Sequence, residues 1–421
     1  MRALEPNVAA DLAIEAGRVF TPASPVDEKS MFSGRTEQIR KVLDAVNQKG
    51  QHVVIFGERG VGKTSLSNVL SSFLLHPQSP VISPRVNCDA TDTFGSLCLK
   101  IFREIELSQT IRSRGFSPGV TQTPVNAVAL LGGDFSPDGI RRALTVLSHH
   151  TIPIIIIDEF DRVAASVRTA IADTIKTLSD HAVRTTLVLV GVAENVEQLV
   201  DEHHSIERAL VQIPMPRMSP DEIEQIFRTG LSRLSMSIEK AGLKRITVLS
   251  QGLPHYAHLL GLYASRVALD ARSSEILLGD VHLAVNRALD GAQQSIRASY
   301  HLALRSPRKD NLFAEVLLSC ALAQTDALGE FAAQDVRSPM QAVTGKDYGI
   351  SSFAQHLNEF ADVKRGTILR KSGTKRRFRY KFTNPLMQPF VIMRGVSAGR
   401  LTDVILDRMT EKSWRFLSDE C

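Results

Sequence analysis

Residues 57–64 have the side chains and the spacing in this sequence that are best suited to chemistry, because they read Gly-Glu-Arg-Gly-Val-Gly-Lys-Thr. Glycines at the first, fourth and sixth positions allow a tight turn, so that backbone N–H groups can approach phosphate oxygens at the start of a helix. Lys63 can reach the β- and γ-phosphates, and the Thr64 hydroxyl can join a magnesium shell. The segment therefore predicts binding of a nucleoside triphosphate. The expected contacts are Gly57, Glu58, Arg59, Gly60, Val61, Gly62, Lys63, Thr64 and Ser65.

The acidic pair Asp158 and Glu159 follows the isoleucine run 154–157. A continuous β-branched run is typical of a parallel strand buried on both faces, and such a strand places the next residue at its carboxyl end. There Asp158 would hold Mg²⁺ near Thr64, directly or through water. Glu159 would orient or deprotonate the attacking water. With Lys63, these acids predict ATP hydrolysis.

Two further positions are expected to act on the triphosphate. The strand-like run 186–192 leads to Glu194 and Asn195, and in ATPases with this strand plan a polar residue here senses the γ-phosphate. Spacing does not decide between these two residues, and Asn is also common in turns. Arg208 precedes a strand-like segment, where it could act as an arginine finger on a neighbouring subunit's nucleotide. A surface arginine in an ion pair is the alternative.

These side chains must be positioned by a parallel sheet. Residues 52–56 form an apolar run before the glycine loop, and a helix is expected from Ser65 onward, which gives the order strand, loop, helix. Together with the later strand-like runs, this order predicts the α/β class. Residues 113–138 are rich in Gly, Pro, Ser and Thr, and we expect them to form a loop or disordered insertion in the core.

The composition is that of a soluble globular protein. With 421 residues, the chain is long enough for two or three domains. The net charge of +5 is weak evidence for a nucleic-acid partner, and the four scattered cysteines are expected to be reduced thiols. No stretch approaches the roughly 20 apolar residues of a membrane span, and no basic-then-apolar leader opens the chain. We therefore expect a cytoplasmic protein without membrane contact.

The order of these segments resembles the AAA+ ATPases, and within them the initiator branch that includes the origin-recognition ATPases. Phe32 and Arg35 match the Phe-x-Gly-Arg segment that lies by the adenine in this branch. Residues 219–222 resemble the exit from the core into a helical lid, and residues 250–257 resemble the lid segment that reaches back over the nucleotide. This branch often has a lid arginine where this chain has His255, which implies a weaker hold on the γ-phosphate and slow turnover.

The sequence changes character from Pro307 onward. Apolar spacing predicts three helices, at 311–324, 331–343 and 350–363, and then two strands, at 367–370 and 378–382. This order matches a winged helix, which also follows the core in initiator-type AAA+ proteins.

The predicted hairpin is strongly basic, with no acidic residue between Lys364 and Lys381. A basic wing can follow a DNA phosphate backbone, so we expect double-stranded DNA to be bound mainly through its backbone. Docking of a protein partner, or a solvated edge that resists aggregation, are the alternatives. The candidate DNA-binding residues are Arg370, Lys371, Lys375, Arg376, Arg377 and Arg379.

The predicted fold is therefore α/β, a P-loop NTPase parallel-sheet core with an all-α lid and a C-terminal winged-helix domain. We expect the core at residues 1–215, with residues 1–30 wrapping or preceding it, the lid at 216–300 and the winged helix at 301–421. The predicted function is an ATPase with ATP and Mg²⁺ as cofactors, DNA as a partner, and assembly of like subunits through Arg208. The alternatives are a regulatory or defence-type nucleotide switch whose winged helix docks a protein effector, or a transposition-associated ATPase.

Overall fold

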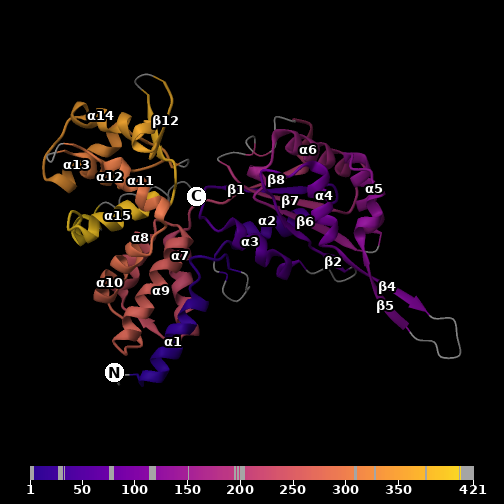
Figure 1. Ribbon diagram of the computed structural model, residues 1–421, viewed down its shortest axis with the longest axis horizontal. Coiled ribbons are helices and arrows are strands. Elements are labelled where there is room, and N and C mark those ends of the chain that lie inside the picture. The colour runs from indigo at the N-terminus through magenta and orange to yellow at the C-terminus, as the bar shows by residue number, and fades with distance from the viewer. Residues whose placement is uncertain are drawn as a thin grey trace. The chain divides into compact units, whose positions relative to one another are not determined.

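The computed structural model places the chain in two compact units (Figure 1). The core unit consists of Pro25–Glu58 and Gly62–Pro216, and the helical unit of Met1–Ser24, Arg59–Val61 and Arg217–Cys421. The structure describes residues 4–26, 32, 34–74, 80–112, 120–149, 151–193, 196, 199, 204–307, 311–326, 329–374, 377–406 and 408.

A parallel sheet forms the centre of the core unit. Its strands are β1 (His52–Gly57), β2 (Val81–Ile82), β3 (Arg85–Asn87), β6 (Ile152–Asp158), β7 (Thr186–Val192) and β8 (Leu210–Pro214). Their order is β2-β6-β7-β1-β8, with β3 also paired to β6, and every pairing among them is parallel. The predicted parallel-sheet core is confirmed. Because β7 lies between β1 and β6, the carboxyl ends of these three strands form one edge.

Helices cover both faces of this sheet (Figure 1). On one face, α4 (Phe94–Arg103), α5 (Pro137–Ser148) and α6 (Ala165–Asp180) share a hydrophobic cluster with Ile155 and Ile157. On the other face lie α2 (Thr36–Val46) and α3 (Lys63–Leu70). Every residue of β6 is buried, which explains why its sequence is continuously apolar rather than alternating.

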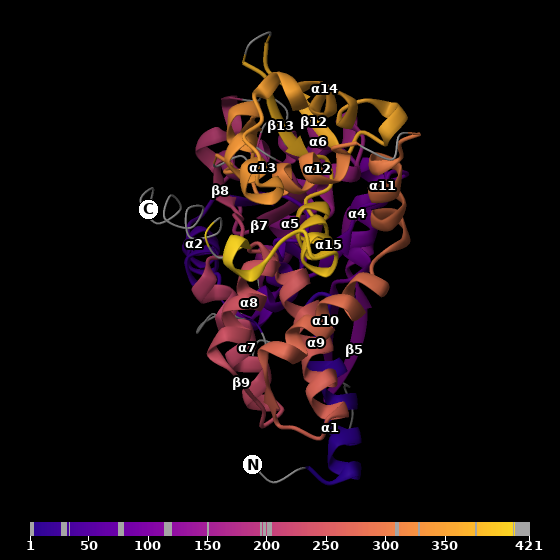
Figure 2. The same cartoon turned by 90° about the vertical axis from the view of Figure 1, so that its left-hand side faces the viewer.

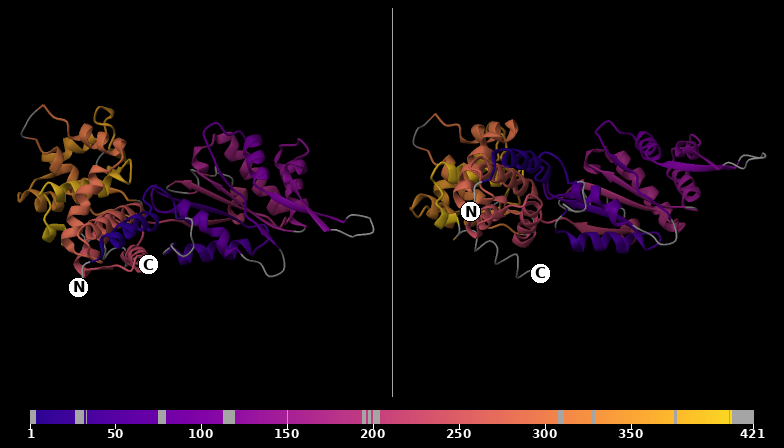
Figure 3. Two further views of the ribbon diagram at one scale, coloured as in Figure 1. Left: turned by 60° about the horizontal axis from the view of Figure 1, so that its bottom comes forward. Right: turned by 90° about the horizontal axis from the view of Figure 1, so that it is seen from below.

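The insertion in the core is more regular than the sequence suggested. Strands β4 (Glu106–Arg112) and β5 (Val120–Asn126) pair as an antiparallel hairpin that extends away from the neighbouring elements in both views of Figure 3. A short 3₁₀ helix, η3 (Ala127–Leu131), follows. The prediction of an irregular loop is therefore wrong for residues 120–131 and correct for residues 132–136. In β5, β-branched residues recur at every second position and favour a strand.

The first part of the helical unit is a bundle (Figure 2). Its helices are α1 (Pro6–Val19), α7 (Pro220–Arg233), α8 (Lys240–Ser250), α9 (Pro254–Asp270) and α10 (Leu278–Asp290). Phe20, fully buried, packs against Phe227 of α7 with ring centroids 5.8 Å apart. A two-stranded parallel pair, β9 (Ser237–Ile238) with β10 (Glu275–Ile276), is a small departure from the predicted all-α lid. Within the described residues, no helix is long and apolar enough to cross a membrane.

The second part of the helical unit combines helices with a small sheet of order β11-β13-β12. Its elements are α11 (Gln294–Leu304), α12 (Phe313–Ala321), β11 (Phe331–Ala332), α13 (Arg337–Thr344), α14 (Ile350–Phe360), β12 (Leu369–Ser372), β13 (Arg379–Phe382) and α15 (Met387–Ser397). Several bounds differ from the prediction, among them those of α12, which spans residues 313–321 rather than 311–324. Residues 331–332 form a strand rather than a helix start, α14 ends at Phe360, and the first hairpin strand is 369–372 rather than 367–370.

Helix α15, which the sequence did not predict, joins the two parts of the helical unit. It packs against α8 and α10 on one side and against α11 and α12 on the other. Two polar contacts reinforce this junction. Arg217 donates to Gln388 Oε1 at 2.7 Å, and the buried Tyr256 hydroxyl donates to the Leu386 carbonyl at 2.6 Å.

Candidate nucleotide-binding site

The glycine loop connects the carboxyl end of β1 to the first turn of α3. Two of its glycines are required by the backbone. A Cβ at Gly57 would lie 2.5 Å from the Met215 carbonyl oxygen, and Gly62, which precedes α3, has φ 94°, in the left-handed region that favours glycine. The loop therefore presents the N-terminus of α3 at the carboxyl edge of the sheet, where backbone N–H groups have no helical partner.

Lys63 begins α3 and is only 7% exposed. Its ammonium donates to the Gly57 carbonyl at 2.9 Å and to the Glu58 carbonyl at 2.7 Å. A buried cation needs such partners, since an unpaired charge is costly inside a protein. The lysine is thus held across the mouth of the loop by backbone oxygens.

Asp158 ends β6 and is connected directly to α3. The Ser67 hydroxyl approaches Asp158 Oδ2 at 3.1 Å and lies 2.9 Å from the Thr64 carbonyl oxygen. This contact joins α3, one turn after Thr64, to the acidic end of β6. A hydroxyl and a carboxylate are oxygen ligands of the kind that Mg²⁺ prefers. The described residues contain no cluster of three or more His, Cys, Asp or Glu that could hold a metal ion.

Arg85 is a second neighbour of Asp158 that sequence reasoning missed. Its guanidinium donates to Asp158 Oδ2 at 2.9 Å, and the Asp158 side chain is only 3% exposed. Ser67 was missed as well. The sequence carried only a weak signal for Arg85, because this residue opens a strand of three residues, β3. In the structure, Asn87 of this strand lies opposite Asp158.

Glu159 lies just beyond the sheet edge, with φ 55° in the left-handed region. Its side chain is 48% exposed and accepts a hydrogen bond from Arg162 at 2.7 Å. The next acid, Asp161, accepts the backbone N–H of Val192 at 2.7 Å, which ties this turn to the end of β7. The structure therefore brings Thr64, Asp158 and Glu159 to one edge, with Glu159 facing solvent.

Two of the other predicted residues of the triphosphate site, Glu194 and Asn195, lie outside the described residues. Arg208 is described, and its side chain is 86% exposed, 3.8 Å from Asp180, a weak surface pair. It precedes β8, whose first residue pairs with His52 at the start of β1. Arg208 therefore lies at the amino-terminal edge of the sheet, opposite the glycine loop of its own chain.

The remaining predicted residues have structural partners. Arg35 is 2% exposed, has φ 61°, and donates to the Pro216 carbonyl at 2.6 Å, while Phe32 is half-buried. His255, in the helical unit, lies with Nδ1 2.9 Å from the Pro22 carbonyl oxygen. Burial lowers the pKa of His255 below its ordinary value, and the Pro22 contact only partly offsets this. The imidazole is therefore neutral at neutral pH.

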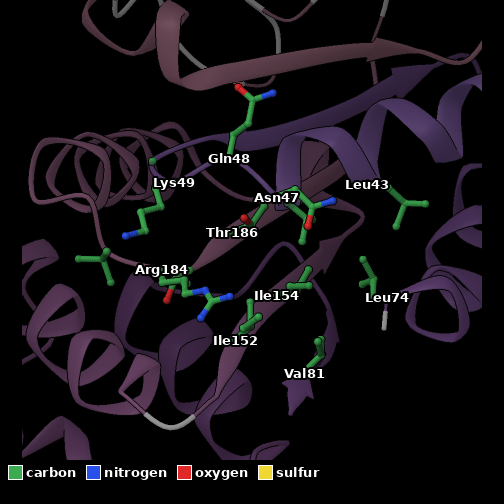
Figure 4. Close-up of a pocket in the computed structure, with 14 residues that line it drawn as sticks. Leu43, Asn47, Gln48, Lys49, Leu74, Val81, Ile152, Ile154, Arg184 and Thr186 are labelled. Atoms are coloured by element: carbon green, nitrogen blue, oxygen red, sulfur yellow. The ribbon is translucent and has the colours of Figure 1, made fainter. Parts of the chain in front are cut away.

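A cavity of about 160 Å³ opens at the other edge of the sheet (Figure 4). It is lined by Ile152 and Thr186, the first residues of β6 and β7, together with Lys49 and Arg184. This cavity is thus separate from the edge that holds Gly57 and Asp158.

Comparison with known protein families places this geometry in context. Residues 46–200 match a family model described as an AAA domain. This segment therefore resembles AAA domains. We call it the AAA segment. It contains the glycine loop and the Asp158–Glu159 pair, and it ends before Arg208. No curated protein was found to match the chain.

Solved structures with low sequence identity were also found to be similar to this chain. A Walker-type ATPase of Pyrococcus abyssi aligns with a TM-score of 0.51 at 16% identity, covering 89% of this chain and 99% of that one. Cdc6p of Pyrobaculum aerophilum has a TM-score of 0.45 at 14% identity over 94% and 98% of the two chains. The ORC1 protein of Aeropyrum pernix, solved in complex with DNA, has a TM-score of 0.45 at 15% identity over 91% and 97%. At 16% identity, the similarity to the Pyrococcus abyssi ATPase supports the P-loop NTPase fold and nothing further.

Proposed function

We propose that the chain binds ATP with Mg²⁺ in the AAA segment and hydrolyses the bond between the β- and γ-phosphates, which releases ADP and phosphate. The observation that carries this proposal is the contact of Ser67 with Asp158, at 3.1 Å. It connects the acidic end of β6 to α3, the helix that begins with Lys63 and Thr64. A phosphate-binding helix start, a hydroxyl and a carboxylate thus meet at the carboxyl edge of a parallel sheet, where α/β proteins commonly bind ligands.

Each residue then has a role that its surroundings allow. The loop N–H groups from Gly57 to Ser65 would hold the phosphates, and Lys63 would exchange its carbonyl partners for phosphate oxygens. Thr64 and Asp158 would hold Mg²⁺, which supplies charge neutralisation at the transferred phosphoryl group. Glu159, already exposed, would orient or deprotonate water. Either Glu194 or Asn195 would sense the γ-phosphate.

Two residues of the predicted site take modified roles in this proposal. Arg35 donates a hydrogen bond to the Pro216 carbonyl. We therefore propose that Arg35 positions the segment around Phe32 near the adenine and does not contact the base itself. His255 belongs to the helical unit, and its imidazole lacks the permanent charge of the lid arginine that the resemblance implies at this position. Slow turnover is the expected consequence.

We further propose that Arg208 acts on the nucleotide of a neighbouring copy, because it lies at the edge of the sheet opposite its own chain's loop. Arg208→Ala should reduce turnover by roughly 10³-fold or more, the effect typical of an arginine finger, without weakening nucleotide affinity. Turnover measured over a range of protein concentrations tests this. Wild-type activity per subunit should rise with concentration, and the variant should stay low. Equal activity in the two proteins would remove Arg208 from the site.

The C-terminal part of the helical unit supports a winged helix. Three helices, α12, α13 and α14, are followed by the β12–β13 hairpin, and β11 completes a three-stranded sheet. The exposed residues of α14 include Ser351, Ser352, Gln355 and Asn358. Glu359, which would repel phosphate, is paired with Arg365 at 2.8 Å. We propose that this region binds double-stranded DNA, with domain boundaries near residues 215 and 300.

Removing charge from the hairpin tests this directly. Arg376→Ala, Arg377→Ala and Arg379→Ala in one variant should weaken DNA binding on the order of tenfold at about 0.15 M salt, because each phosphate contact releases counterions. The plot of log affinity against log salt should also become shallower by roughly one for each phosphate that the variant no longer neutralises. Fluorescence anisotropy with a labelled duplex measures both.

A matched control removes the same charge elsewhere. Arg18, Lys41 and Arg228 are exposed and each pairs with a neighbour on its own helix, so their triple alanine variant should bind DNA as the wild type does. If both triple variants lose affinity equally, the hairpin is not the DNA site. Lys375 and Arg376 lie outside the described residues. Arg376 is one of the three arginines replaced in the hairpin variant.

One observation favours a protein partner as the second candidate. Arg379 lies 3.9 Å from both Asp326 and Asp335, and Lys371 donates to Asn358 while lying over the Phe378 ring. Part of the basic hairpin is therefore engaged within the chain. A winged helix that docks a protein effector in a regulatory, defence-type or transposition-associated switch would suit this arrangement, and wild-type protein would then ignore DNA at physiological salt.

A further inference from the structure

The carboxylate of Asp158 already has a cation beside it. Arg85 donates to Oδ2 at 2.9 Å and the Ser67 hydroxyl approaches the same oxygen at 3.1 Å. The other oxygen, Oδ1, accepts the backbone N–H of Glu159 at 2.8 Å. Both oxygens of the proposed magnesium ligand are thus engaged by donors, and one donor carries a full positive charge.

Strand register dictates this contact. β3 runs parallel to β6, with Arg85 opposite Ile156 and Asn87 opposite Asp158. Side chains two residues apart on a strand point to the same face, so Arg85 and Asn87 share the face of the sheet on which Asp158 lies. The long arginine side chain needs to extend two residue pairs along the strands to reach the carboxylate. The strand register therefore brings the Arg85 guanidinium within reach of the Asp158 carboxylate.

We infer that Arg85 competes with Mg²⁺ for Asp158, so that the guanidinium must leave this carboxylate before the metal–nucleotide complex is held. This inference rests on the proposed function. Arginine keeps its proton at every physiological pH, so it can yield its place only by moving. Two cations on one buried carboxylate would repel each other at a distance where screening by water is weak.

The structure also provides a place for the displaced group. The Arg85 side chain is 29% exposed, whereas that of Asp158 is 3% exposed. The same guanidinium nitrogen, Nη2, donates to Asn87 Oδ1 at 3.2 Å, and Asn87 is exposed. Arg85 can therefore turn toward solvent while it keeps one hydrogen-bond acceptor. When no metal is present, Arg85 neutralises the charge of Asp158. When the metal–nucleotide complex binds, Arg85 moves away and the carboxylate becomes available to the metal.

The first test is the magnesium requirement for nucleotide binding by the full chain. A fluorescent, non-hydrolysable ATP analogue is titrated with Mg²⁺ at fixed concentration. Arg85→Gln should lower the Mg²⁺ concentration for half-maximal binding by roughly two- to fivefold, the range expected for removing one partly exposed charge pair. Arg85→Lys keeps the charge and should stay near wild type. Arg142→Gln, which removes an exposed ion pair with Asp134 and Asp138, is the matched control and should not change the requirement.

The second test separates competition from a merely structural ion pair. Thermal unfolding is followed in EDTA, and again with Mg²⁺ and ADP. Without metal, Asp158 of the Arg85→Gln protein is buried without a neighbouring cation. The melting temperature of this variant should therefore fall below that of wild type. With Mg²⁺ and ADP the difference should shrink or reverse, because the metal then neutralises Asp158 in both proteins. A structural pair alone would give the same difference under both conditions.

The outcomes distinguish this inference from the proposed function. If wild type fails to bind the analogue at any Mg²⁺ concentration, the proposed function is wrong. If wild type binds with a clear Mg²⁺ dependence and Arg85→Gln has the same or a higher requirement, competition at Asp158 is wrong while the nucleotide site stands. Weaker binding by Arg85→Gln at saturating Mg²⁺ would also overturn competition, since Arg85 would then be a ligand of the nucleotide itself.

Discussion

Lys63→Ala should lower the affinity for ATP by on the order of 100-fold or more. The lysine is buried and its ammonium is directed across the loop by two backbone carbonyls. In the nucleotide complex it would form charge-assisted hydrogen bonds to phosphate, each worth about 1.5–3 kcal/mol, and alanine removes them all. Isothermal titration calorimetry with ATP and Mg²⁺ measures the loss.

Lys49→Ala is the matched control for this variant. Lys49 is an exposed lysine of the same core unit, and it lines the cavity at the opposite edge of the sheet (Figure 4). Its replacement should leave ATP affinity within about twofold, since an exposed charge far from the phosphates acts weakly through water. Circular dichroism should show that both variants are folded. If the two variants bind ATP equally well, the glycine loop is not the nucleotide site.

Glu159→Gln should separate binding from turnover. The amide keeps the size of the side chain but cannot accept a proton, so kcat should fall by about 10²- to 10⁴-fold, the usual contribution of a general base. The variant also removes the ion pair with Arg162, in which both side chains are about half exposed, so stability should change little. ATP affinity should stay within about threefold. Steady-state phosphate release and a binding titration on the same sample give both values.

Glu37→Gln serves as the control for this change. Glu37 lies on α2 in the same unit and pairs with Lys41 at 2.7 Å, so the variant removes a comparable surface pair without touching the proposed site. Its kcat should match that of wild type. A Glu159→Gln protein that hydrolyses ATP at the wild-type rate would remove Glu159 from the catalytic role, even with nucleotide binding intact.

The long elements of the core could be predicted because their signals are local. The buried strand β6 is a continuous β-branched run, and β7 was predicted at its observed bounds, residues 186–192. Helix α7 begins where the sequence indicated, since Ser219 and Glu222 form a capping box. The short strands β2 and β3, of two and three residues, could not be predicted, because a period of two needs more positions to be visible.

The same distinction applies to the candidate site. Lys63, Thr64, Asp158 and Glu159 were found because each belongs to a compact motif with its own spacing. The contact of Arg85 with Asp158 joins residues 73 positions apart, and it depends on which strand pairs with β6 and in which register. Nothing local in the sequence specifies that pairing. Partners of this kind become visible only when the sheet is assembled.

ATP hydrolysis by the purified full-length protein, with and without double-stranded DNA at moderate salt, tests the central claim most directly. We predict Mg²⁺-dependent phosphate release that is slow alone, changes when DNA is added, and falls by about 10²-fold or more in Glu159→Gln under both conditions. Hydrolysis that is indifferent to DNA would contradict the coupling and favour a switch with a protein partner. Phosphate release that persists unchanged in Glu159→Gln and Lys63→Ala would contradict the assignment of the site itself.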